Sequence, residues 1–254
     1  MTRLQGRLGI AAILLVGAWL PGPARSAAPQ VSAPPVEGKY CYLTFDDGPL
    51  PGTSEILALS RRLEIPVSMM MIGGEVDAGK RQRQMFDIAM HDPYAFVGDH
   101  SYSHASGGYI RFYTNPEGVL ADIKKAHESM KLTNRVVRLP GRNIWSVKGR
   151  TKYDLVNGVA AAELLAANGF ILLGWDVEWQ HDPKTGKPVQ GAPEMLRDIE
   201  LAFHHAFTPN HVVILAHDEM FRNLSEDAEL MLLMKSLKKR GYIFRTLADY
   251  PGVG

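Results

Sequence analysis

The sequence of 254 residues has little cysteine and almost no net charge. Its one cysteine, Cys41, excludes an intramolecular disulfide and a zinc site built from several cysteines. The formal charge of +1, from 28 Lys+Arg against 27 Asp+Glu, argues against a nucleic-acid partner, because phosphate binding requires a basic face. The composition also excludes a disordered or collagen-like chain, since 46% of the residues are apolar and 22% are charged.

The N-terminal apolar run is too short for an ordinary membrane span. Leu8–Leu20 has 13 residues, whereas a spanning helix needs about 20. Arg3 and Arg7 precede the run, and small residues follow it, which predicts a signal peptide over 1–28 and an exported protein, periplasmic or secreted. The alternative is an uncleaved membrane anchor. A Pro-rich linker follows at 29–38. The basic excess lies in the signal, so the remainder carries a net charge of −2.

Residues 39–254 alternate between apolar, strand-like runs and segments with helical periodicity, and they are predicted to form one domain. The expected strands are Tyr40–Phe45, Pro66–Ile72, Ala95–Asp99, Val136–Leu139, Phe170–Trp175, Val212–Ala216 and Tyr242–Thr246. The expected helices are Ser54–Leu63, Lys80–Met90, Pro116–Leu132, Tyr153–Asn168, Pro193–Phe207 and Ser225–Arg240. This alternation predicts an α/β fold with a parallel sheet, helices outside it, and an incomplete or distorted barrel.

Polar residues follow the ends of several expected strands, where active sites of parallel α/β folds gather. Asp46 and Asp47 follow the first strand. Two adjacent carboxylates at a strand end can hold different roles, one binding a cation and the other handling a proton. The alternative is a simple turn, because Asp, Gly and Pro all favour turns.

Two histidines follow the third strand at a spacing that suits one metal ion. His100 and His104 are four residues apart, which would place both imidazoles on one face of a helical turn. With Asp47 they give three protein ligands, the pattern of a catalytic zinc site with room for water. Iron(II) accepts the same ligands, so an oxygenase is a less favoured alternative for an exported chain.

Arg138 and His217 end two further expected strands. Arg138 could form a salt bridge that caps the barrel, or it could hold a catalytic carboxylate ionised and fix its direction. His217 could be a buried core residue or a proton donor, because the imidazole titrates near neutral pH.

The order of the motifs resembles the polysaccharide deacetylases, the NodB-homology enzymes of carbohydrate esterase family four. The motifs are Thr44-Phe45-Asp46-Asp47-Gly48-Pro49, His100-Ser101-Tyr102-Ser103-His104, Arg138-Leu139-Pro140, Trp175-Asp176-Val177-Glu178 and Ile214-Leu215-Ala216-His217-Asp218. The resemblance extends from about Tyr40 to about Thr246. It implies a distorted (β/α) barrel of seven or eight mostly parallel strands.

The resemblance also implies roles for individual residues. A divalent metal, usually zinc with Co²⁺, Ni²⁺ or Fe²⁺ as alternatives, would be bound by Asp47, His100 and His104. Asp46 would be the general base toward water, and His217 the general acid toward the departing amine.

Further residues would support this chemistry. Arg138 would orient Asp46, a backbone N–H near Gly141 would help to stabilise the oxyanion, and Leu215 would wall the acetyl pocket. The supporting carboxylate of the fourth motif is best matched by Glu178, with Asp176 as its rival. Trp175 is one of several aromatic residues near the motifs that could stack on a sugar or merely pack at the barrel rim.

Two positions depart from the family pattern. Gly141 stands where the family often has an aromatic residue, so the cleft floor would be open or filled from elsewhere, for example by Trp145. Asp99 replaces the usual Asn before His100, and its charge would raise the basicity of its neighbours or pair with a basic residue. Neither departure removes a metal ligand or the base, so an active enzyme is expected.

The leading hypothesis is therefore a metal-dependent N-deacetylase that acts on N-acetylglucosamine residues of an exported or cell-envelope glycan, such as peptidoglycan, a chitin-like polymer or an exopolysaccharide. An O-acetyl ester deacetylase of the acetyl-xylan type and a non-catalytic glycan-binding protein of the same fold are the alternatives. No stable membrane span is expected once the signal is cleaved, and the sequence does not indicate an oligomeric state.

Overall fold

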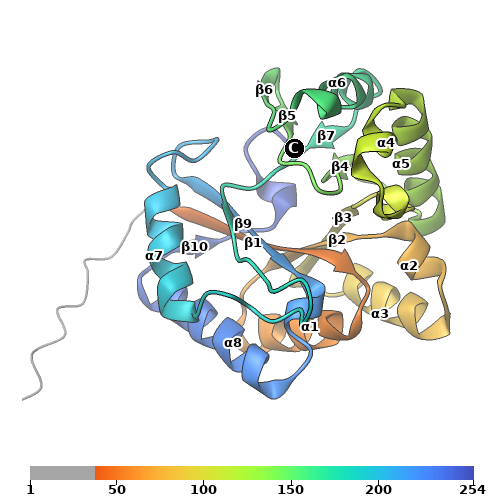
Figure 1. Ribbon diagram of the computed structural model, residues 1–254. Helices are drawn as coiled ribbons and strands as arrows, with labels where there is room; N and C mark the ends of the chain where they lie inside the picture. Colours follow the sequence, from red (N-terminus) through yellow and green to blue (C-terminus); the bar gives the residue numbers. More distant parts are fainter. Residues whose placement is uncertain (1–37) are drawn as a thin grey trace, which may run out of the picture. The chain divides into compact units, whose positions relative to one another are not determined.

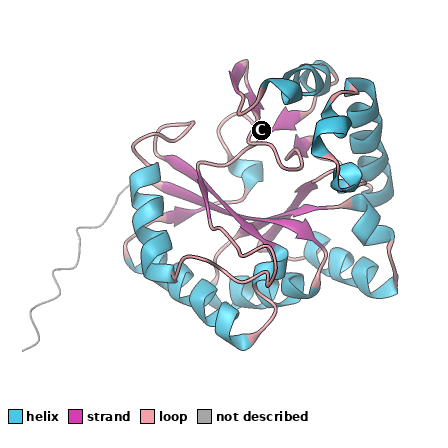
Figure 2. Cartoon of the chain, viewed as in Figure 1, coloured by secondary structure: helices cyan, strands magenta, loops and turns pink. Residues whose placement is uncertain are grey.

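The protein is described by a computed structural model that covers residues 38–254, apart from the side chains of residues 107 and 224–227. The predicted signal peptide, 1–28, and the linker except its last residue lie outside the described residues. Within the described part, a twisted sheet is surrounded by helices (Figure 1 and Figure 2). None of the helices described there has both the length and the apolar character that a membrane crossing requires.

Eight strands pair in parallel, and two more form an antiparallel hairpin. The parallel strands are β1 (Tyr40–Gly48), β2 (Val67–Met71), β3 (Ala95–Asp99), β4 (Val136–Val137), β7 (Ile171–Leu172), β8 (Val177–Glu178), β9 (His211–His217) and β10 (Ile243–Phe244). The hairpin consists of β5 (Trp145–Val147) and β6 (Arg150–Lys152). The order across the sheet is β6-β5-β7-β4-β3-β2-β1-β9-β8, and β10 pairs with the start of β1. The expected α/β fold, a distorted (β/α) barrel of seven or eight mostly parallel strands, is confirmed, and the sheet has eight parallel strands besides the hairpin.

The helices cover the sheet and follow the expected alternation. They are α1 (Pro51–Leu63), α2 (Gly73–Asp77), α3 (Lys80–Met90), α4 (Tyr109–Tyr113), α5 (Pro116–Met130), α6 (Val159–Ala167), α7 (Ala192–Ala202) and α8 (Leu224–Lys239). Short 3₁₀ turns lie at η1 (His104–Gly107), η2 (Val156–Gly158), η3 (Asp218–Met220) and η4 (Leu247–Asp249). Local sequence sets the boundaries of α5: the side chain of Asn115 caps its start, Pro116 occupies its first position, and Lys131 ends it with φ 53°.

The central strands are buried on both faces, which explains why they read as continuous apolar runs. In β2 every residue is buried, including Met69, Met70 and Met71. Cys41 in β1 is fully buried as expected, and burial raises the pKa of its thiol. This residue therefore behaves as a small apolar side chain.

The elements that the sequence did not predict are short. The strands β5, β6 and β8 and the helices α2 and α4 each have two to five residues. Such segments carry too few residues to establish a period of 2 or 3.6, so tertiary contacts decide their conformation. The turn at Lys148 and Gly149, with φ 48° and 74°, closes the hairpin.

The strand register brings the motif residues to one edge of the sheet. Asp46 lies opposite His217 in the β1–β9 pair. Asp99 lies opposite Met71 in the β2–β3 pair and opposite Val137 in the β3–β4 pair. Since His100 and Arg138 immediately follow Asp99 and Val137, the backbone pairing alone places the motif residues next to one another.

Candidate active site

A local irregularity at the end of β1 sets the positions of Asp46 and Asp47. The parallel register to β2 shifts between Asp46 and Gly48, and Asp47 adopts a left-handed conformation with φ 73°. Adjacent strand residues normally point to opposite faces, so this bulge turns both carboxyl groups toward one cavity. The cavity has a volume of about 370 Å³, and both residues line it. Asp46 is buried, whereas Asp47 is partly exposed.

Asp47, His100 and His104 converge on one point. The Oδ1 atom of Asp47 lies 3.3 Å from Nε2 of His100 and 3.1 Å from Nε2 of His104. One ligand atom from each of the three residues lies within 4.8 Å of the others. The two histidines do not share a helical turn, however. Ser101 and His104 adopt φ values of 69° and 48°, so a left-handed turn, rather than a helix face, brings the imidazoles together.

This ligand set fits a divalent metal. Nδ1 of His100 lies 2.8 Å from the carbonyl oxygen of Arg138, which places the proton on Nδ1 and leaves Nε2 free as a ligand. Among the described residues, the buried Oδ1 atom of Asp47 finds no well-aligned hydrogen bond. A buried carboxylate oxygen facing two imidazole nitrogens is the arrangement that a cation would satisfy.

The electrostatics of Asp47 favour the ionised, ligating form. Burial opposes ionisation, but the interactions with His100 and His104 outweigh it and hold the pKa of Asp47 well below its usual range. In the same cluster the pKa of His100 is raised, because Asp46 and Asp47 outweigh the desolvation of the ring. A proton and a metal therefore compete for this imidazole.

Arg138 is completely buried beneath Asp46. Its Nη1 atom donates to Oδ1 of Asp46 at 2.8 Å and to Oγ1 of Thr44 at 2.6 Å. Its other nitrogens donate to the carbonyl oxygens of Leu173 at 3.1 Å and Gly174 at 2.9 Å. The guanidinium thus fixes the direction of the Asp46 carboxylate and joins β1 to the loop after β7. Oδ2 of Asp46 remains 3.6 Å from Nε2 of His100, beside the ligand cluster.

His217, at the end of β9, lines the same cavity. Burial is the main cause that lowers the pKa of His217, and the electrostatic influence of His181 adds to it, while Asp46 and Asp47 oppose this shift. The ring packs edge-on against His181, with centroids 4.6 Å apart. Within residues 38–254 its buried Nδ1 atom has no hydrogen-bond partner.

The two rival carboxylates of the fourth motif lie in different surroundings. Asp176 accepts hydrogen bonds from the backbone N–H groups of Phe207 at 2.7 Å and Val213 at 2.9 Å, so it ties loops to the sheet. Glu178 lines the cavity, but no hydrogen bond joins it to His217 in the described part of the chain. Trp175 and Leu215 also line the cavity.

Tyr109 occupies the space beside Gly141. Gly141 has φ +61°, and a Cβ atom placed on it would lie 2.9 Å from Cζ of Tyr109. The expectation that Trp145 fills this part of the cleft is wrong. Trp145 is completely buried elsewhere and stacks on Phe207, with centroids 4.5 Å apart.

Asp99 pairs with a histidine instead of a Lys or Arg. Its Oδ2 atom lies 2.9 Å from Nδ1 of His127, and its Oδ1 atom accepts the N–H of Ser101 at 2.7 Å. Nε2 of His127 faces the carbonyl oxygen of Asn134 at 2.5 Å. His127 is therefore a partly buried structural partner of Asp99.

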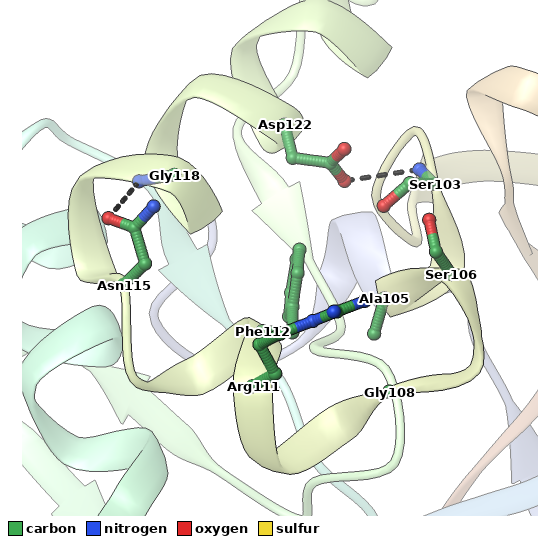
Figure 3. Close-up of a pocket in the computed structure, with 9 residues that line it drawn as sticks. All are labelled: Ser103, Ala105, Ser106, Gly108, Arg111, Phe112, Asn115, Gly118 and Asp122. Carbon is green, nitrogen blue, oxygen red and sulfur yellow. Dashed lines mark hydrogen bonds between the residues drawn. The ribbon is translucent and has the colours of Figure 1, made fainter.

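A second cavity, of about 360 Å³, lies beside the histidine turn, α4 and the start of α5 (Figure 3). Ser103 and Ala105, on either side of His104, line it together with Arg111 and Phe112 of α4. The Asp122 carboxylate accepts the backbone N–H of Ser103 at 3.1 Å, which ties the histidine turn to α5.

Three residues of the active-site cavity were not identified from the sequence as a working part of the site: Tyr109, Asp154 and His181. All three lie in or beside short, irregular segments. No partner for His181 stands at a regular spacing in the sequence, yet its Nε2 atom lies 3.3 Å from Oε1 of Glu219. The sequence signal for Tyr109 is only that it is an aromatic residue close to the histidine motif.

Comparisons with known proteins agree with this geometry. Residues 33–144 match the family model described as polysaccharide deacetylase. The chain is 24% identical over 217 residues to a putative polysaccharide deacetylase, YheN, of Bacillus subtilis, covering 83% of this chain and 68% of the relative. It is 25% identical over 219 residues to a peptidoglycan-N-acetylglucosamine deacetylase of Bacillus cereus, covering 82% of this chain and 69% of that protein.

Solved structures share the fold. A CE4 esterase of Streptococcus mutans superposes with a TM-score of 0.64 at 22% identity, over 83% of this chain and 86% of the other. The catalytic domain of a peptidoglycan N-acetylglucosamine deacetylase of Eubacterium rectale gives a TM-score of 0.63 at 20% identity, over 87% and 95%. The chain is therefore similar to polysaccharide deacetylases in sequence over residues 33–144, and it shares the fold of solved CE4 enzymes.

Proposed function

We propose that this protein is a metal-dependent hydrolase that removes N-acetyl groups from N-acetylglucosamine residues of an exported or cell-envelope glycan. One observation carries the proposal: the Asp47–His100–His104 cluster, the arginine-held carboxylate of Asp46 and the imidazole of His217 all face one cavity. Three ligands, a base and an acid around one cavity suit hydrolysis of an unactivated amide.

Asp47, His100 and His104 would hold the metal. When bound there, a divalent ion such as zinc supplies a Lewis acid that polarises the acetamide carbonyl and the attacking water. Asp46 takes a proton from that water as its oxygen forms the new bond to the carbonyl carbon. Arg138 keeps the accepting carboxylate aimed at the cavity throughout this step, because its bond to Oδ1 leaves Oδ2 on the side of the ligand cluster.

His217 completes the reaction. The bond between the carbonyl carbon and the nitrogen breaks, and the imidazolium of His217 gives its proton to the departing amine. The products are acetate and a glycan with a free amino group. His217 suits this role because it lines the cavity from the strand next to β1, with its position in the sheet directly opposite Asp46.

The glycan class is inferred from the relatives and from the shape of the site. A cavity of about 370 Å³ accommodates an acetamido group and part of one sugar, while the rest of a polymer would extend beyond it. One relative is named a peptidoglycan-N-acetylglucosamine deacetylase. Export through the signal predicted at 1–28 would bring the enzyme to such a polymer.

Acetate release from a glycan panel tests the proposal. The zinc-loaded protein should release acetate from N-acetylated oligosaccharides, a chelator should abolish the release, and added zinc should restore it. Asp46→Asn should lower kcat at least about 1,000-fold, because the base and its charge are both lost. Asp87→Asn, at an exposed carboxylate of α3, is the matched control and should retain activity. Undiminished turnover by Asp46→Asn would exclude Asp46 as the base.

The same panel separates the alternatives. Acetate release from acetyl-xylan but not from chitooligosaccharides would indicate an O-acetyl ester deacetylase. Binding of glycans by the zinc-loaded protein without any turnover would indicate a glycan-binding protein of the same fold.

A further inference from the structure

The helix α4 places a tyrosine over the part of the cavity where the acetyl oxygen is expected. Tyr109 begins this helix five residues after His104, and its ring meets the His104 ring edge-on, with centroids 5.9 Å apart. Tyr113, one turn later, donates from its hydroxyl to the carbonyl oxygen of Pro140 at 2.7 Å. Residues four apart share a helix face, so this bond also fixes Tyr109 against the turn that contains Gly141.

The contact between Tyr109 and Gly141 is made by the far end of the ring. A Cβ atom on Gly141 would lie 2.9 Å from Cζ, 3.0 Å from Cε1 and 3.1 Å from Cε2 of Tyr109. Since the hydroxyl is attached to Cζ, it lies beside the backbone of Gly141. Glycine is required here both because of its φ of +61° and because any side chain would displace the ring.

The Tyr109 hydroxyl is free to serve a ligand. In the part of the chain that the structure describes, it has no hydrogen-bond partner, although Tyr109 lines the active-site cavity. Arg111 and Phe112 of the same helix line the second cavity instead (Figure 3), and Tyr109 is the residue of α4 that lines the active-site cavity. A phenol is protonated at neutral pH and can donate one hydrogen bond.

We propose that Tyr109 is a catalytic residue whose hydroxyl donates a hydrogen bond to the acetyl oxygen of the substrate, beside the backbone N–H of Gly141. This inference rests on the proposed deacetylase function. The bond strengthens as the carbonyl oxygen gains negative charge during attack by water, so it stabilises the transition state more than the bound substrate. No proton is transferred from Tyr109, and the hydroxyl is unchanged after each turnover.

Removal of the hydroxyl alone is the first test. Tyr109→Phe should lower kcat about 10- to 100-fold with KM changed less than about threefold, because one donor to a developing oxyanion is lost while the ring remains. Tyr94→Phe is the matched control, since Tyr94 precedes β3 at the end of that strand remote from the site, and its kcat should not change. A Tyr109→Phe kcat within threefold of the wild type would overturn the proposal.

A double-mutant cycle tests the contact with Gly141. Gly141→Ala should push the ring aside and remove the same hydrogen bond, besides straining the backbone. In the Tyr109→Phe background the hydroxyl is already absent, so Gly141→Ala should cost at least about threefold less in kcat than in the wild type. Strictly multiplicative losses would contradict a shared hydrogen bond. Circular dichroism and thermal melting of each variant identify any that fail to fold.

Acetate binding distinguishes this inference from the proposed function. Acetate, measured by calorimetry on the zinc-loaded protein, can present an oxygen to the same donors without turnover. Tyr109→Phe should weaken acetate binding about 10- to 100-fold, the effect expected for losing one hydrogen bond to a charged acceptor, and Tyr94→Phe should not. Absence of acetate release from every glycan would defeat the proposed function, whereas unchanged acetate affinity in Tyr109→Phe would defeat the role of Tyr109.

Discussion

Replacement of Arg138 by methionine should reveal how strongly the catalytic carboxylate depends on its counter-charge. The guanidinium is completely buried and binds Oδ1 of Asp46 at 2.8 Å. Methionine is unbranched and apolar and replaces the aliphatic part of the arginine, so it leaves Asp46 buried without its charged partner. Loss of one member of a buried ion pair costs about 3–5 kcal/mol, and the free energy of unfolding of Arg138→Met should fall by this amount.

The double variant Asp46→Asn/Arg138→Met separates charge from the other bonds of Arg138. The neutral amide of Asn removes the uncompensated charge, so this variant should be more stable than Arg138→Met by about 1–3 kcal/mol. The remaining loss would come from the carbonyl groups of Leu173 and Gly174, which lose their donor.

Urea unfolding of the metal-free proteins at pH 7, followed by circular dichroism, measures these differences. Arg83→Met is the control for removing a surface arginine. Its ion pair with Asp77 is solvent-exposed, and its loss should cost at most about 1 kcal/mol. If Arg138→Met and the double variant unfold at the same urea concentration, the charge on Asp46 does not need Arg138 and the reasoning is refuted.

Three further predictions concern titration. Burial raises the pKa of Asp218 to about 7, so the native state binds a proton that the unfolded state releases from about pH 4 upward. The free energy of unfolding should therefore fall by up to about 4 kcal/mol between pH 4 and 7 because of this group. In urea titrations, Asp218→Asn should show a smaller fall with pH, and the same dependence on pH as the wild type would contradict the prediction. The pKa of His217 is lowered, chiefly by burial and in part by His181, so its imidazole resonance in the metal-free protein should titrate below pH 6.5. In His181→Phe the pKa of His217 should rise, and a fall in that pKa would count against this electrostatic coupling. The pKa of His100 is raised by Asp46 and Asp47, so zinc affinity measured by competition with a chromophoric chelator should weaken as the pH falls below 7, and a pH-independent affinity would argue against His100 as a ligand.

The positions of the candidate ligand residues were predictable from the sequence because the ends of buried strands are predictable. Buried parallel strands leave continuous apolar runs, and the polar residues after those runs meet at one edge of the sheet. The structure accordingly brings Asp47, His100 and His104 within 4.8 Å of one another. The spacing of His100 and His104 predicted that they lie close together on a helical turn. They do lie close together, but the positive φ values of Ser101 and His104 form a left-handed turn instead of a helical one.

The rest of the cavity could not be predicted because it depends on tertiary contacts of short segments. Tyr109 reaches the site only because α4 is held by the bond from Tyr113 to Pro140. His181 reaches it through a loop that folds back on itself at the His181–Pro188 bridge. Neither contact leaves a periodic signal in the sequence, and both become visible only when segments distant in the chain are placed side by side.

The left-handed backbone of two candidate metal-ligating residues limits how this site could be re-engineered. Asp47 and His104 have φ values of 73° and 48°, a region that Asn, Asp and His enter more readily than other non-glycine residues. Substitutions among Asn, Asp and His are therefore the ones that could be made at these two positions without adding backbone strain. Efforts to retune metal preference should thus vary oxygen against nitrogen donors at 47 and 104, and leave longer or branched side chains to other positions.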